Sequence, residues 1–147
     1  MPSGDSGAVT KTTNHEYTVE FRIWGEALDA AQVSRDLGLE ACQTRTPGAG
    51  RCAGRIDEGM WAYNGPPGSP TEWSSLEGGL LYVLGSLWPH RETIEKYAAT
   101  SSLVWWCGHF QSSVDGGPRL SPALLRKLGE FGADLYIDNY FSPSEDS

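Results

Sequence analysis

Cys107 and His109 are the residues whose types and spacing come closest to a metal site. They lie two apart in a stretch, 103–111, that is typical of a strand, so both side chains point to the same side of it. A structural zinc site needs four ligands and a catalytic one usually three. Since His90 and Glu92 lack the spacing of a second ligand pair, we predict no metal site. We expect a half-buried cysteine beside a surface histidine.

Catalytic patterns are absent elsewhere in the sequence. His15, His90 and His109 are scattered, and there is no nucleophile elbow, phosphate loop or dinucleotide fingerprint. Carboxylates at 57–58, or at Asp134 and Asp138, could act as an acid–base pair, but charged loop and edge positions explain them more simply. We therefore predict no catalytic residue and no cofactor.

An alternative is an enzyme or ligand-binding domain with a pocket between the sheet and the Gly- and Pro-rich loop 42–70. In that case His109 and a nearby carboxylate would do the chemistry. Arg45, Arg51 and Arg55 also lie in this loop and could bind an anion together with backbone N–H groups. A flexible surface loop without a ligand is the simpler explanation of the three arginines.

The bulk composition limits the partners of the chain. Its 147 residues form one domain, and a net charge of −8 argues against binding to nucleic acid or to an anionic membrane surface. The same charge is compatible with a cationic protein partner. We find no membrane span and no signal-peptide core, so we expect a cytoplasmic protein whose three cysteines, Cys42, Cys52 and Cys107, are free thiols. The oligomeric state is left open.

A strand followed by a capped helix occurs once in each half of the chain. Residues 17–24 alternate like a strand and lead to a helix with Asp29 as N-cap, Gln32 completing a capping box, and Gly38 at its end. Residues 103–111 lead in the same way to a helix that starts at Ser121 and Pro122. We predict that the two strands are adjacent, antiparallel and related by a pseudo-twofold axis.

The remaining elements complete the expected domain. A short strand is predicted at 59–63, a long leucine-rich helix from Ser74 or Ser75 until Pro89 interrupts it, and a last strand at 133–141. The order indicates an α+β fold, with an antiparallel or mixed sheet, helices on one face and a ferredoxin-like split βαβ repeat. We expect residues 1–15 to be a disordered lead-in, 16–142 the domain and 143–147 a flexible acidic tail. The leucine stripes are expected to include Leu81 and Leu125. The main core candidates are Val33, Leu37, Leu80, Leu84, Leu124 and Leu128.

Alternation along the strands predicts an aromatic face on the sheet. Arg22 and Trp24 lie opposite Phe21 and Ile23 on the first strand. On the last strand, the predicted face carries Tyr136, Asp138 and Tyr140. The middle strand adds either Trp105, Cys107 and His109 or Trp106 and Phe110, and we include His109 among the candidate binding residues. Exposed aromatics among charged groups are typical of contact sites, although the loop 61–73 could instead cover them.

Several segments occur in a defined order along the chain: 21–29 and 33–39, then Gly59 and Trp61, the leucine-rich helix at 76–87, and finally 116–125 with 138–140. In this order and spacing they resemble the DUF4279 family of small bacterial proteins. The resemblance covers about residues 16–141 and implies a shared fold. The family is one of unknown function, so the resemblance supplies no catalytic residue.

Together these features favour a non-enzymatic module that binds another protein. We expect recognition through the aromatic sheet face and its acidic rim, with a cationic protein as partner. One concrete form of this expectation is an immunity-type protein that neutralises a toxin.

Overall fold

The structure is a computed structural model that describes residues 15–47 and 58–143. The first strand begins at His15, and the predictions for residues 1–14 and 144–147 lie outside the described residues. The elements in chain order are β2 (His15–Glu26), α2 (Ala30–Leu37), β3 (Gln43–Arg45), β4 (Glu58–Tyr63), α3 (Leu76–Leu87), the 3₁₀ helix η2 (Trp88–His90), α4 (Arg91–Tyr97), β5 (Ser102–Gln111), α5 (Pro122–Phe131) and β6 (Asp134–Phe141). None of the described helices is long and apolar enough to cross a membrane.

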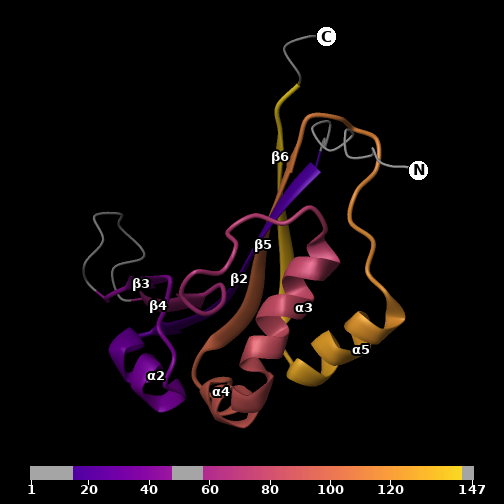
Figure 1. The fold of residues 1–147 in the computed structure, drawn as a ribbon. Helices are drawn as coiled ribbons and strands as arrows, with labels where there is room; N and C mark the ends of the chain where they lie inside the picture. The colour runs from indigo at the N-terminus through magenta and orange to yellow at the C-terminus, as the bar shows by residue number, and fades with distance from the viewer. Residues whose placement is uncertain (1–14, 48–57, 144–147) are drawn as a thin grey trace.

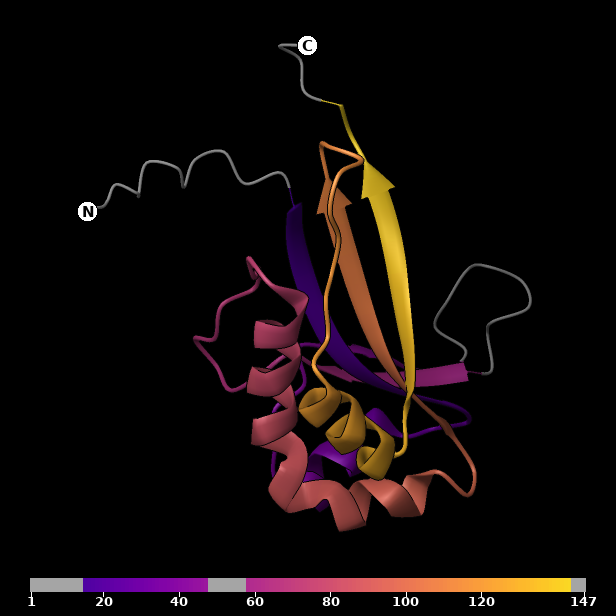
Figure 2. The same ribbon diagram turned by 90° about the vertical axis from the view of Figure 1, so that its right-hand side faces the viewer.

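The five strands form one mixed sheet in the order β3-β4-β2-β5-β6. All neighbours are antiparallel except β5 and β6, which are parallel. Figures 1 and 2 show the helices gathered on one side of this sheet. The predicted α+β class is therefore confirmed, as is the antiparallel pairing of the strands predicted at 17–24 and 103–111.

The predicted pseudo-twofold relation does not extend beyond the central strand pair. A twofold that exchanges β2 and β5 would also exchange their outer neighbours, β4 and β6. However, β4 is antiparallel to β2 whereas β6 is parallel to β5. The chain after β5 crosses back through α5 and so arrives parallel, as a crossover connection requires. The ferredoxin-like arrangement is not confirmed.

The helix ends follow the local sequence signals. The Asp29 carboxylate accepts hydrogen bonds from the backbone N–H groups of Ala31 and Gln32, and Gly38 ends α2 with a positive φ of 68°. Ser121 accepts from the N–H of Leu124 at the start of α5. The Gln32 side chain donates to Asp36. No reciprocal bond from Gln32 to the Asp29 N–H is among those of the described residues, so the capping box predicted there is not formed.

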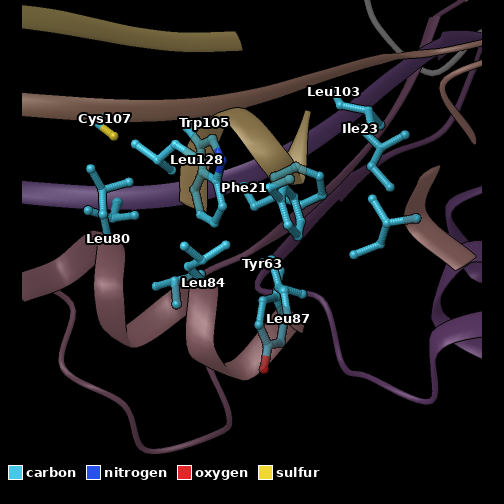
Figure 3. Close-up of a cluster of buried hydrophobic side chains, with 14 of the residues drawn as sticks. Phe21, Ile23, Tyr63, Leu80, Leu84, Leu87, Leu103, Trp105, Cys107 and Leu128 are labelled. Carbon is cyan, nitrogen blue, oxygen red and sulfur yellow. The ribbon is translucent and has the colours of Figure 1, made fainter. Parts of the chain in front are cut away.

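The core lies between the helices and one face of the sheet. Figure 3 shows leucines of α3 pointing toward side chains of β2 and β5, including Phe21 and Trp105. The core prediction is wrong for two leucines: Leu81 is 46% exposed and Leu125 is 50% exposed. Each lies one position outside the buried stripe of its helix. The six main core candidates are all buried, namely Val33, Leu37, Leu80, Leu84, Leu124 and Leu128.

Candidate binding face

The side of the sheet that faces away from the helices is called here the open face. Residues paired directly across two strands point to the same side, and the register pairs Glu20 with Trp106 and Trp106 with Tyr136. Its main members on the three long strands are Glu20, Arg22, Trp24, Val104, Trp106, Phe110, Asp134, Tyr136, Asp138 and Tyr140. The strand order thus brings Arg22, Trp24, Tyr136, Asp138 and Tyr140 together, as predicted from alternation.

Arginines and aromatic rings alternate across this face. The guanidinium carbon of Arg45 lies 5.2 Å from the ring centroid of Trp24, and that of Arg22 lies 6.0 Å from Trp24 and 4.5 Å from Trp106. The Trp106 ring is 4.5 Å from that of Tyr136. These distances are within the range of cation–π and aromatic contacts. The series Arg45–Trp24–Arg22–Trp106–Tyr136 is called the ring series below.

A second ring pair extends the aromatic surface toward the far end of the same strands. Phe110 and Tyr140 stack with centroids 4.7 Å apart and planes 9° from parallel. The hydroxyl of Tyr140 donates to the Asp138 carboxylate, which raises the pKa of that hydroxyl. Tyr136 and Tyr140 are each 45% exposed. Tyr136 thus packs on Trp106 and Tyr140 on Phe110, yet each tyrosine keeps nearly half of its surface in water.

The open face is acidic in spite of its arginines. Arg22 is held by an ion pair with Glu20, 2.8 Å between Nε and Oε1. The described residues of this side, counting β3 and β4, carry the two guanidiniums of Arg22 and Arg45. They also carry six carboxylates, from Glu16, Glu20, Glu26, Glu58, Asp134 and Asp138. The excess of negative charge would favour the approach of a cationic molecule.

A shallow hollow of about 480 Å³ lies on this face, where the end of β2 meets the starts of β4 and β5. Trp24 and Trp106 form its aromatic walls. It is lined by Arg22, Trp24, Glu58, Ser102, Val104 and Trp106. The hollow is large enough to receive a side chain of a partner.

The loop 61–73 does not cover these rings. Its last residue, Trp73, extends the sheet by exchanging two backbone hydrogen bonds of 2.8 Å with Tyr17. The Trp73 ring then packs on Tyr82 of α3, with centroids 5.1 Å apart. The loop therefore folds toward the helices, and the alternative in which it buries the aromatic face is wrong.

The position predicted for His109 is also wrong. His109 pairs with Tyr17 on the helix-covered side of the sheet, where it is only 3% exposed. Cys107 lies on the same side and is fully buried, so the expected half-buried cysteine beside a surface histidine is not found. The open face receives Trp106 and Phe110 from β5 instead. The alternation of Val104, Trp106 and Phe110 is compatible with this placement. In the sequence, however, the neighbouring Trp105 makes the opposite side of the strand look equally aromatic.

His109 belongs to a chain of hydrogen-bonding groups that joins three strands. Its Nε2 lies 2.9 Å from Nδ1 of His15, and its Nδ1 lies 2.9 Å from Oδ1 of Asn139. Nε2 of His15 lies 2.6 Å from the carbonyl oxygen of Asp115. The chain ends in an oxygen on each side, the Asn139 amide oxygen and the Asp115 carbonyl, and neither oxygen can donate. The two histidine rings must then supply all three protons of the three hydrogen bonds, so one ring has to be an imidazolium. If the Asn139 amide turns so that its nitrogen donates to His109, two neutral rings satisfy the same three contacts.

The region beside the loop 42–70 gathers few groups that could catalyse a reaction. A surface hollow of about 250 Å³ lies there between Cys42 and the 64–69 turn. Desolvation of the sulfur, with Glu20 adding to it, raises the pKa of the Cys42 thiol to about 11 although the residue is exposed. His109 lies elsewhere, on the helix-covered side. Asp57, Arg51 and Arg55 are outside the described residues.

The cysteines and the possible metal ligands are the remaining candidates for chemistry. Cys42 and Cys107 are free, and Cys52 lies outside the described residues. Burial raises the pKa of the Cys107 thiol to about 12. Within residues 15–47 and 58–143, no group of three or more His, Cys, Asp or Glu side chains is placed to hold a metal ion.

The fold is of the α+β class with an exposed aromatic sheet face, and comparison with known proteins identifies the family. The DUF4279 family model, described as a domain of unknown function, matches residues 15–142. The chain therefore belongs to the DUF4279 family. It is also 32% identical over 94 residues to a hydroxymethylglutaryl-CoA synthase of Methanocaldococcus jannaschii, a match that covers 55% of this chain and 27% of that protein. No solved structure matches the chain.

The residues that carried the family resemblance have structural roles. A Cβ at Gly59 would lie 2.2 Å from the backbone oxygen of Leu28, so only glycine lets β4 pass the start of α2. Trp61 is fully buried and donates from its indole nitrogen to the Ser34 hydroxyl at 2.9 Å. These contacts explain the presence of Gly59 and Trp61 by the needs of the fold rather than by a chemical role.

Proposed function

We propose that this protein is a binding module that recognises a cationic protein through its open face. The observation that supports the proposal best is the ring series, in which aromatic side chains stay partly exposed on a sheet face that the described helices and loops leave uncovered. Large aromatic residues together with arginine are the side chains that dominate protein–protein contacts. Aromatic side chains that stay in water contribute little to the stability of the protein alone, and a contiguous exposed patch of them is typical of an interaction site.

Charge defines the class of partner. The open face carries more carboxylates than guanidiniums, and the whole chain has a net charge of −8. Such a surface attracts a cationic protein and speeds its encounter at low ionic strength. We propose that the protein acts in the cytoplasm of a bacterium, and that neutralisation of a basic toxin is one form that this binding takes.

Partner capture followed by quantitative titration tests this proposal. The tagged protein is used to capture proteins from its native host, and each captured protein is purified and titrated separately. We expect a partner of basic charge whose affinity falls at least tenfold for Trp24→Ala and for Tyr140→Ala. Leu125→Ala is the matched control, since Leu125 is half exposed on α5, away from the open face.

The titration also defines the contrary result. If the Trp24→Ala and Tyr140→Ala proteins are folded and bind every captured protein as tightly as the parent does, the open face is not the binding site. A salt titration gives a second criterion. The affinity of the parent for a cationic partner should fall between about 50 and 200 mM salt, because surface charges are screened.

A further inference from the structure

Strand β6 presents a long free edge of the sheet. It is the last strand in the order and pairs with β5 along all eight of its residues. Figure 2 shows it at the margin of the sheet, with most of its length away from the helices. Within the described residues, no other strand lies on its outer side, so alternate backbone N–H and C=O groups there lack a sheet partner. Such an edge is a template for another strand.

Several of the usual protections of an edge strand are missing from β6. Its sequence, DLYIDNYF, contains no proline, lysine or glycine, and it runs for eight residues. Four of its apolar or aromatic side chains are exposed, two on each face: Tyr136 and Tyr140 on the open face, and Leu135 and Phe141 on the other. A strand with this composition would normally be covered by another element.

The carboxylates of β6 disfavour a second copy of the chain as that element. In antiparallel self-pairing, the register that sets Tyr136 opposite Tyr140 also sets Asp138 opposite the Asp138 of the other copy. Like charges directly opposite each other are destabilising. Each copy also has a net charge of −8, which adds long-range repulsion. The same carboxylates would attract a basic strand.

The two sides of β6 specify an alternating partner sequence. On the open face, Asp134 and Asp138 flank Tyr136, whose ring is the outermost member of the ring series. A lysine or arginine of an added strand could lie over this ring between the two carboxylates. On the other face, Leu135, Ile137 and Phe141 offer apolar contacts to alternate residues of the added strand, interrupted only at Asn139.

We propose that β6 binds, by strand addition, an extended segment in which Lys or Arg alternates with apolar residues. The cationic character of the partner rests on the function proposed above, whereas the mode of binding rests on the edge itself. Strand addition gives affinity through main-chain hydrogen bonds and specificity through alternate side chains. The sheet would grow from five strands to six.

Synthetic peptides test the proposal without knowledge of the natural partner. The probe is a capped ten-residue peptide in which Lys and Val alternate, and the controls are the same peptide with Glu in place of Lys and two peptides N-methylated on one or the other set of alternate amides. We expect the Lys–Val peptide to bind at least tenfold more tightly than the Glu–Val peptide. One methylated peptide should lose at least tenfold in affinity, because methylation blocks the edge bonds.

Hydrogen exchange and charge reversal locate the binding. The Lys–Val peptide should slow amide exchange within 134–141, and the double variant Asp134→Lys, Asp138→Lys should lose at least tenfold in affinity for it. The proposal is wrong if the Lys–Val peptide does not bind at millimolar concentration, if both methylated peptides bind as well as the parent peptide, or if exchange in β6 is unchanged.

The two proposals can fail separately. If a captured partner depends on Trp24 but binds the Asp134→Lys, Asp138→Lys protein normally, the open face is the binding site and strand addition at β6 is wrong. If the Lys–Val peptide protects β6 while no captured protein depends on Trp24 or Tyr140, the edge proposal stands and the function proposed for the open face fails.

Discussion

Trp105 and Trp106 are neighbours in the chain, yet they belong to the two opposite faces of the sheet. Trp105 is fully buried among Phe21 and Phe131, with ring centroids 5.1 and 5.5 Å away. Trp106 is partly exposed between Arg22 and Tyr136. The same side chain is thus used once within an apolar core and once on a charged surface. The difference indicates that the helix-covered face stabilises the fold and the open face is available for contacts.

The largest expected effect separates these two tryptophans. Trp105→Ala should lower the free energy of unfolding by about 3–5 kcal/mol, because it leaves a large cavity in the core. Trp106→Ala should cost about 1 kcal/mol, since its ring is partly in water already. Urea denaturation of the two variants measures both values. Equal losses would contradict the distinction between the faces.

A milder substitution of Trp105 serves as the control for folding. The indole N–H of Trp105 is buried and has no hydrogen-bond partner among the described residues. Trp105→Phe keeps most of the ring and removes this unsatisfied donor, so it should cost clearly less than Trp105→Ala. A Phe variant as unstable as the Ala variant would show that the shape of the indole, rather than its volume, is what the core requires.

Alkaline pH should act on the helix-covered face through Cys107. Its pKa in the folded protein is raised to about 12 from an ordinary value of 9.0, so only the unfolded chain loses this proton between those values. Stability from this group is fully present below pH 9 and is lost as the pH rises toward 12, at up to about 1.4 kcal/mol per pH unit. Cys107→Ala should decline less steeply over this window. Parallel curves of unfolding free energy against pH would contradict the assignment.

The hydrogen-bonded histidines provide a smaller test at the end of the same face. His15→Ala leaves the buried ring of His109 without one partner, which should cost about 1–2 kcal/mol. Glu16→Ala is the matched control, because Glu16 is the next residue on β2 and is exposed on the other side. A loss no larger for His15→Ala than for Glu16→Ala would show that the contact contributes nothing to stability.

Local signals in the sequence predicted most of the elements, whereas the relations between strands needed the structure. The cap at Asp29, the start at Ser121 and the leucine stripe of α3 depend on neighbouring residues only. The parallel direction of β6 depends on how the crossover through α5 returns to the sheet, which no local pattern records.

The candidate site was predicted in part for the same reason. Alternation placed Arg22, Trp24 and Tyr140 on one face because each strand has one clearly apolar side. It failed for His109, since β5 carries bulky apolar residues on both sides and only pairing with β2 decides which side is covered. Arg45 was considered as an anion ligand in a loop, but it lies on a short edge strand and stacks on Trp24.

A titration that compares the two faces directly is the most decisive experiment. The purified cationic partner is titrated with the parent, Trp106→Ala and Trp105→Phe proteins, and the unfolding free energy of each is measured under the same conditions. We expect Trp106→Ala to bind at least tenfold more weakly with little loss of stability, and Trp105→Phe to bind like the parent with reduced stability. Unchanged binding by a folded Trp106→Ala protein would contradict the assignment of the open face as the binding surface.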